Sequence, residues 1–300
     1  MDNLEEKMEK LKKAGDIHVK VMREAVKLVK PGVKLLEVAE YVESRIVELG
    51  GGIAFPCNIS INEAAAHYSP CYKDEKVFSE GDVVKLDIGV HVDGYIADGA
   101  VTVDLSGSYG DLKRAAEDAL KSAIKEIVPP MEVGEIGAII QEVIESYGYK
   151  PISNLSGHVM ERYLLHSGIS IPNVRESSKE YIDVGDIVAI EPFATEGAGQ
   201  VVDGSERYIF KFLRVRPLRL PLARKLLRFI ESRYPHLPFS ERWILKEDVK
   251  YRSALRNLVI SGCIYAYPVL IEKERGIVTQ AEHTVLLTEN GVEVITKGLL

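Results

Sequence analysis

The chain has 300 residues, of which 46% are hydrophobic and 28% are charged, and its formal net charge is −7. No apolar run approaches the roughly 18 residues of a membrane-spanning helix, and the charged N-terminal residues lack the apolar core of a signal peptide. The three cysteines form no CxxC pair and no disulfide framework. Together these features predict a cytoplasmic globular protein.

Two amphipathic helices are predicted first. Apolar residues recur at helical spacing from Leu4 to Leu28, and a second such run extends from Val33 to Leu49. Each run stops at glycine, at Gly32 and at Gly50. Strand-like segments then lead to residues 85–105, where apolar residues alternate around an Asp-Gly pair, as in a β-hairpin. Two further helices are predicted, at about 111–128 and 134–147, followed by more strands.

The predicted hairpin contains two carboxylates, Asp87 and Asp98, although aspartate is a poor strand former. If Asp93-Gly94 forms the turn, Asp87 faces Ala100 and Asp98 faces Gly89. The two aspartates then lie on one face as diagonal neighbours, roughly 7–8 Å apart at Cα. The alternative is that this face simply points to solvent, but the small residues opposite both aspartates leave room for a site.

A second predicted strand, 184–193, repeats the pattern of 80–89 and aligns Glu191 with Asp87, 104 residues earlier. Because two helices followed by strands occur twice, we predict a duplicated α+β unit with a pseudo-twofold that brings the matching acids together. Another acid, Glu282, lies centrally in a predicted apolar strand, 279–288. Four carboxylates and one histidine would suit two divalent ions such as Mn, Fe, Co or Zn.

Several histidines could complete such a site. His18 and His236 lie among charged residues, so we expect them to be solvated. His67, His158 and His166 lie in the segments AAAHYSP, SGHVMERY and YLLHSGI, and are the candidates for a functional role. The residues by themselves leave the choice among these three open.

The spaced set Asp87, Asp98, His158, Glu191 and Glu282 resembles the metal-binding set of the methionine aminopeptidases, which have the pita-bread fold. The surrounding segments are similar too, over nearly the whole chain: AFPCNISINEAAAHYSP, KLDIGVHVDGYIAD, GHVMERYLLHSGISIPN, AIEPFAT and AEHTVLL. The resemblance implies an α+β pita-bread fold and a cytoplasmic hydrolase that removes the initiator methionine when the second residue is small. A segment of extra residues before Glu282 looks like the helical insert of type 2 enzymes, in their archaeal form.

The resemblance also implies the metal ligands. Asp87 would bind one ion with both its oxygens, Asp98 and Glu282 would bridge two ions, and His158 and Glu191 would complete the second. Two divalent ions per chain are expected, as Co, Mn, Fe, Zn or Ni. They would hold the water or hydroxide that attacks the carbonyl of the first residue.

The remaining roles concern the substrate, the N-terminal methionine of nascent polypeptides. The resemblance implies that Glu191 would shuttle a proton, that His166 would stabilise the developing oxyanion, and that His67 would lie near the leaving amine. Phe55 and Tyr267 would line the methionine pocket. The catalytic residues are thus expected to be His67, His166 and Glu191.

A basic segment separates Glu191 from Glu282. Residues 211–256 contain thirteen lysines and arginines against four acids, a local charge of +9. We predict an inserted basic helical subdomain, about 205–265, within a single catalytic domain spanning 1–300. It could contact the ribosome, or it could be only a solvated cationic face. We expect a monomer with no membrane contact.

Two other functions are compatible with such a fold. One is an Xaa-Pro aminopeptidase or prolidase, although those enzymes usually carry a separate N-terminal domain. The other is a pita-bread module that has lost its ligands and binds nucleic acid, for which the basic segment would be suited. The intact set of ligand types favours the aminopeptidase over both.

Overall fold

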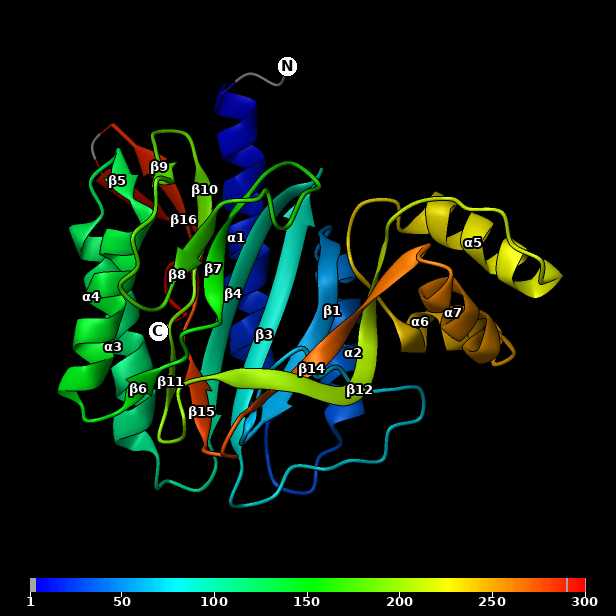
Figure 1. Ribbon diagram of the computed structural model, residues 1–300, viewed down its shortest axis with the longest axis horizontal. Helices are drawn as coiled ribbons and strands as arrows, with labels where there is room; N and C mark the ends of the chain where they lie inside the picture. The colour runs from blue at the N-terminus through cyan, green and yellow to red at the C-terminus, as the bar shows by residue number, and fades with distance from the viewer. Residues whose placement is uncertain (1–3, 290, 300) are drawn as a thin grey trace.

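The computed structural model describes residues 4–289 and 291–299. In its N-terminal half, two helices cover one face of a three-stranded antiparallel sheet of order β1-β3-β4 (Figure 1). Helix α1 packs on β3 and β4, and α2 packs on β1. The bounds are α1 (Leu4–Val26), α2 (Leu35–Glu48), β1 (Gly52–Ile61), β3 (Val83–Val92) and β4 (Tyr95–Asp104).

The C-terminal half repeats this plan with a five-stranded sheet of order β17-β16-β10-β7-β8. Helices α3 and α4 lie side by side and cover its outer face (Figure 1). The bounds are α3 (Gly110–Glu126), α4 (Val133–Ser146), β7 (Ser156–Met160), β8 (Ser170–Pro172), β10 (Ile187–Ile190), β16 (His283–Thr288) and β17 (Gly291–Val294). Two helices on one sheet thus occur twice, and the predicted α+β duplication is confirmed.

Smaller sheets complete this half. One has the order β15-β11-β6 and one pairs β5 with β9. Their bounds are β5 (Met131–Glu132), β6 (Lys150–Pro151), β9 (Tyr181–Ile182), β11 (Phe193–Thr195) and β15 (Val278–Gln280).

Three helices project to one side of the molecule, beyond a sheet of order β13-β12-β14-β2 (Figure 1). They have an apolar core of their own, centred on residues such as Leu226, Ile230 and Leu258. The bounds are β2 (Ala64–Ala66), β12 (Val201–Phe212), α5 (Pro221–Arg233), β13 (Phe239–Ser240), α6 (Glu241–Glu247), α7 (Tyr251–Ile260) and β14 (Ile264–Glu272). The basic segment of the sequence forms these helices.

The register predicted for the hairpin is confirmed. Asp87 pairs with Ala100 and Asp98 pairs with Gly89 across β3 and β4. The turn residues Asp93 and Gly94 both have positive φ, 50° and 88°, as the tight hairpin turn requires. A side chain at Gly89 would collide with the ring of Phe55, so the small residue opposite Asp98 makes room for an aromatic ring.

The prediction that Glu191 and Glu282 lie inside continuous strands is wrong. Strand β10 ends at Ile190 before β11 begins at Phe193, and β15 ends at Gln280 before β16 begins at His283. The break between β10 and β11 and the break between β15 and β16 therefore lie at the same level of the sheet. The amide of Ala281 bonds to the carbonyl of Pro192 there (3.2 Å), and a proline at this break has no N–H to continue the ladder.

The expectation that His18 is solvated is also wrong. The side chain of His18 is completely buried between α1 and the β3–β4 hairpin. Its Nε2 lies 2.9 Å from the carbonyl oxygen of Ile88 and 3.2 Å from that of Gly99. His236, by contrast, is exposed as expected. No helix in the described residues has the length and apolar character to cross a membrane.

Candidate active site and metal centre

The site lies where the two duplicated sheets meet, between β4 and β16. The hydroxyl of Thr284 joins them: its Oγ1 accepts from the amide of Asp98 (2.7 Å) and donates to the Asp98 carbonyl (2.8 Å). The amide of Glu282 donates to the carbonyl of Ala100 (3.0 Å). These bonds fix the break between β15 and β16 against the hairpin, so Glu282 is held beside Asp98.

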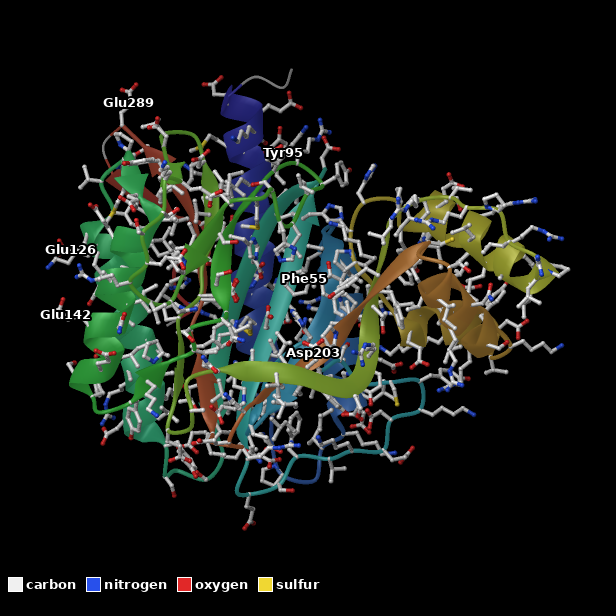
Figure 2. The ribbon with its side chains drawn as sticks, in the orientation of Figure 1. Phe55, Tyr95, Glu126, Glu142, Asp203 and Glu289 are labelled. Atoms are coloured by element: carbon white, nitrogen blue, oxygen red, sulfur yellow. The ribbon has the colours of Figure 1, made fainter. Side chains whose placement is uncertain are left out.

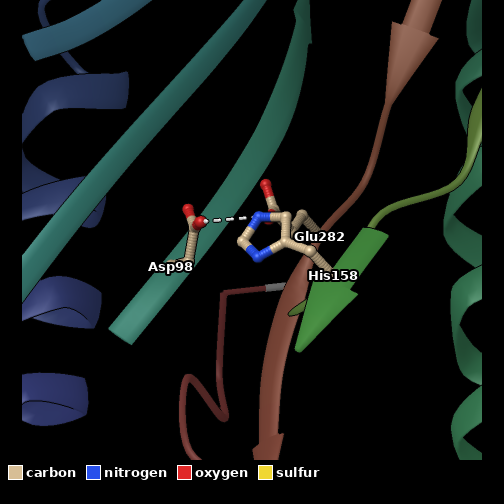
Figure 3. A group of neighbouring side chains, drawn as sticks. All are labelled: Asp98, His158 and Glu282. Carbon is tan, nitrogen blue, oxygen red and sulfur yellow. Dashed lines mark ion pairs between the residues drawn. The ribbon is translucent and has the colours of Figure 1, made fainter. Parts of the chain in front are cut away.

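A histidine completes the group from a third strand, β7 (Figure 3). Ligand atoms of Asp98, His158 and Glu282 all lie within 4.8 Å of one another. The Nε2 of His158 lies 3.6 Å from Asp98 Oδ2 and 3.6 Å from Glu191 Oε1. Asp87 lines the same pocket. The structure therefore brings the five residues predicted as ligands to one place.

The electrostatics of this group are unfavourable without a cation. Burial raises the pKa of Asp87 to about 7. Burial, with the charge of Asp87, also raises the pKa of Asp98 far above its usual value. Burial raises the pKa values of Glu191 and Glu282 in the same way, with the charge of Asp98 adding to it. Clustered acids with no positive partner between them favour protonation, and a divalent ion would supply the missing charge.

Unpartnered polar atoms point to the same conclusion. Among the described residues, the Oδ1 atoms of Asp87 and Asp98 are buried without a hydrogen-bond partner. Buried polar atoms in folded proteins nearly always have one. Carboxylate oxygens with one imidazole are the donors that Mn, Fe, Co, Ni and Zn ions accept. The residues present therefore fit divalent metal ions.

The residues predicted to contact substrate line the same pocket, which has an empty volume of about 530 Å³, its open mouth included. His67 has a left-handed backbone, with φ of 67°. Its Nδ1 lies 3.1 Å from the carbonyl oxygen of Pro268, and its ring meets the Tyr267 ring edge-on at 5.4 Å. The exposed ring of His166 lies 4.4 Å from that of His158. Phe55 lies near the middle of the molecule (Figure 2).

Sequence reasoning did not identify several other lining residues. They are Asn58, Ala66, Leu165, Ile209 and Pro238. Asn58 pairs with Asp87 across β1 and β3, and only the register of that pair would have revealed it. Pro238 comes from the segment between α5 and β13, and nothing in the sequence indicates that this segment reaches the pocket. Gln280, two residues before Glu282, also lines the pocket and donates to Glu282 Oε2 (3.3 Å).

The sequence pattern of metallopeptidase family M24 matches residues 9–289. Methionine aminopeptidase from Methanocaldococcus jannaschii is 67% identical over 289 residues, which cover 96% of this chain and 98% of that protein. Methionine aminopeptidase from Thermococcus onnurineus is 50% identical over 291 residues, covering 96% and 99%.

Solved structures share the fold. A thermophilic Arx1 superposes with a TM-score of 0.87 at 20% identity, covering 98% of this chain and 91% of that one. Methionine aminopeptidase from Thermotoga maritima gives 0.70 at 26% identity, covering 99% and 98%. Prolidase from Pyrococcus furiosus gives 0.64 at 21% identity and covers 99% of this chain but 65% of its own. The curated relatives at 50–67% identity favour neither the prolidase nor the binding-module alternative.

Proposed function

Because the chain belongs to metallopeptidase family M24, among the archaeal-type methionine aminopeptidases, we propose that the pocket between its two sheets removes the initiator methionine with two divalent ions. The curated relatives that match nearly the whole chain are methionine aminopeptidases, metalloenzymes that remove that methionine. The observation that carries the proposal is the set of four carboxylates and one histidine that lines one pocket together with Phe55, Leu165 and Tyr267.

We propose the ligand roles as follows. Asp87 would hold one ion, His158 and Glu191 would hold the other, and Asp98 and Glu282 would each contribute a carboxylate to both. When bound, such ions act as Lewis acids toward the peptide carbonyl and lower the pKa of water. Four carboxylates offset the charge of two divalent ions, which accords with the raised pKa of all four acids. The ion used in the cell, among Co, Mn, Fe, Zn and Ni, is left open.

The protein groups then bind the substrate and move its protons. In neutral His67, Nδ1–H donates to the carbonyl of Pro268, which leaves Nε2 as an acceptor facing the pocket. This Nε2 is suited to accept from the N–H of the scissile amide. His166, at the mouth, donates to the carbonyl oxygen as negative charge develops there. The Glu191 carboxylate takes a proton from water and returns it to the leaving amine.

Specificity follows from the shape of the pocket. Phe55, Leu165 and Tyr267 contribute apolar surface to its lining, and an unbranched thioether fits such surface with little strain. The second residue must lie against the acids, so only a small side chain fits there. Peptides that begin Met-Ala, Met-Gly or Met-Ser are therefore substrates, and those that begin Met-Lys or Met-Glu are not.

We also propose that residues 1–300 form one catalytic domain, which acts as a cytoplasmic monomer, and that the basic subdomain, about 205–265, docks on the ribosome where nascent chains emerge. The support is its charge of +9 between residues 211 and 256. The test replaces five arginines with glutamate: Arg214, Arg216, Arg224, Arg228 and Arg233. Loss of ribosome co-sedimentation is expected, and unchanged co-sedimentation would contradict the docking.

The activity itself is tested with three peptides, Met-Ala-Ser, Met-Lys-Ser and Ala-Pro-Ala, and the Mn²⁺-loaded protein. Cleavage of Met-Ala-Ser only is expected, together with loss of that cleavage in Asp98→Asn. Cleavage of Ala-Pro-Ala instead would mean that the substrate class is wrong.

A further inference from the structure

A second hollow lies next to the catalytic pocket, between the start of β1, the β3–β4 hairpin and the segment that joins α5 to β13. It has an empty volume of about 1180 Å³, open solvent included. We call it the side groove. Aromatic rings form one wall: the centroid of Tyr163 lies 5.5 Å from that of His91 and 5.9 Å from that of His236. Trp243, the only tryptophan of the chain, lines it as well.

The side groove adjoins the catalytic pocket along three separate segments. On β1, Ile53 lines the groove and Phe55 lines the pocket. After β7, Tyr163 lines the groove and Leu165 lines the pocket. Pro238 lines both. Because neighbouring residues on three unrelated segments line the two spaces, the groove starts at the edge of the pocket.

The reaction requires a path of this kind. The substrate is a polypeptide, and the pocket has room for its first residues only. The chain from the third residue onward must leave through the mouth, and three extended residues span about 10 Å. Resting on the function proposed above, we infer that the side groove binds residues three to five of the polypeptide in extended form, and selects aromatic or acidic side chains over basic ones.

The lining accounts for this selection. Aromatic and aliphatic surface from Tyr163, Trp243 and Ile53 suits an aromatic side chain. Arg233 lines the groove, and no carboxylate lines it among the described residues. A basic side chain would therefore meet a positive charge.

Two acids that contact lining residues of the groove, Asp93 and Glu43, already have partners. Asp93 accepts from Lys10 (2.7 Å) and from Arg162 (2.6 Å). Glu43 accepts from Trp243 Nε1 (2.8 Å) and pairs with Arg242. Neither acid is available to attract a basic side chain of the substrate.

The test compares pentapeptides Met-Ala-Ser-Xaa-Gly, with Phe, Glu or Lys as Xaa, and the tripeptide Met-Ala-Ser, which is too short to fill the groove. With the Mn²⁺-loaded protein, we expect kcat/KM to be about 5–10-fold higher for the Phe and Glu peptides than for the Lys peptide. Arg233→Glu should reverse the order of the Glu and Lys peptides. Arg228→Glu is the matched control, because Arg228 is exposed on the same helix but does not line the groove, and it should keep the original order.

A binding readout complements the kinetics. Trp243 fluorescence is titrated with uncleavable analogues whose first amide is reduced to an amine. The Phe pentapeptide should change the emission, whereas the tripeptide should not. Equal kcat/KM for the three pentapeptides, or equal effects of the two glutamate variants, would overturn the inference. If Met-Ala-Ser is not cut at all, the proposed function fails, and the fluorescence titration still decides whether the groove binds peptide: no change with the Phe pentapeptide overturns it.

Discussion

The imidazole of His67 is held in one tautomer and one orientation. Its Nδ1 bonds to the backbone of Pro268, its ring packs against Tyr267, and its own backbone is left-handed. We propose that a histidine fixed in this way at the pocket wall presents Nε2 to the substrate and lies outside the proposed group of metal ligands. Its loss should therefore affect the reaction without affecting the ions.

The corresponding variant is His67→Asn, because asparagine tolerates a positive φ better than alanine does. We expect kcat/KM for Met-Ala-Ser to fall by about 10²–10³-fold, and the number of bound ions per chain to stay the same. Steady-state kinetics and metal analysis on the same sample check this. A drop in metal content would show that His67 supports the metal site instead.

A second residue-scale prediction concerns His18 and pH. Burial lowers its pKa from 6.5 to about 4. The folded protein thus keeps His18 neutral, while the unfolded chain protonates it below pH 6.5. The stability that depends on keeping His18 neutral is fully present above pH 6.5 and is lost as pH falls toward 4. The loss of stability from pH 7 to pH 5 amounts to about 2 kcal/mol.

The variant His18→Gln should remove this part of the pH dependence, because an amide can donate to the same carbonyls without titrating. Urea unfolding of both proteins at pH 7 and pH 5 measures the difference. Parallel losses of stability in the two proteins would show that His18 is not responsible.

At the scale of elements, a buried ion pair attaches the inserted helices to the catalytic half. Arg242 on α6 is completely buried and pairs with Glu43 on α2. It also donates to Ser69 Oγ (3.1 Å) and to the carbonyl of Pro70 (2.9 Å). These bonds hold α6 against the segment that follows His67, so the insert is attached next to a residue that lines the pocket.

Removing one partner of this pair should be costly. Arg242→Met leaves Glu43 buried without its cationic partner, and we expect about 3–5 kcal/mol of lost stability. Adding Glu43→Gln should restore part of it. The control is Lys246→Ala, which breaks an exposed pair with Glu40 (2.5 Å) between the same two helices and should cost less than about 1 kcal/mol. Denaturant unfolding compares the variants, and equal losses in the two single variants would contradict the account.

The sequence predicted some elements better than others. The helix predicted at 111–128 is α3, Gly110–Glu126, and that at 134–147 is α4, Val133–Ser146, because helical periodicity in the sequence reports a buried face directly. The breaks at Glu191 and Glu282 were missed. The apolar runs around them continue without interruption, and only the meeting of the two sheets breaks the strands.

For the whole molecule, the pita-bread fold expected from the resemblance is confirmed by the M24 match and the structural neighbours. The four acids could be named from the sequence pattern and His158 only from the resemblance, and the structure places all five residues around one pocket. The contribution of Pro238 and the side groove could not be predicted. They depend on how the inserted helices lie against the hairpin, which no periodicity in the sequence encodes.

The central claim is that five residues of this pocket hold two divalent ions. The most direct measurement is a count of Mn²⁺ bound by the chelator-treated protein, by calorimetric titration with elemental analysis. We predict two ions per chain, and stabilisation by about 2.7 kcal/mol for each bound ion when free Mn²⁺ is 100 times its dissociation constant.

The variant Asp98→Asn, which lacks one bridging carboxylate, should bind at most one ion. A wild-type protein that binds one ion or none while cleaving Met-Ala-Ser would contradict the two-ion site.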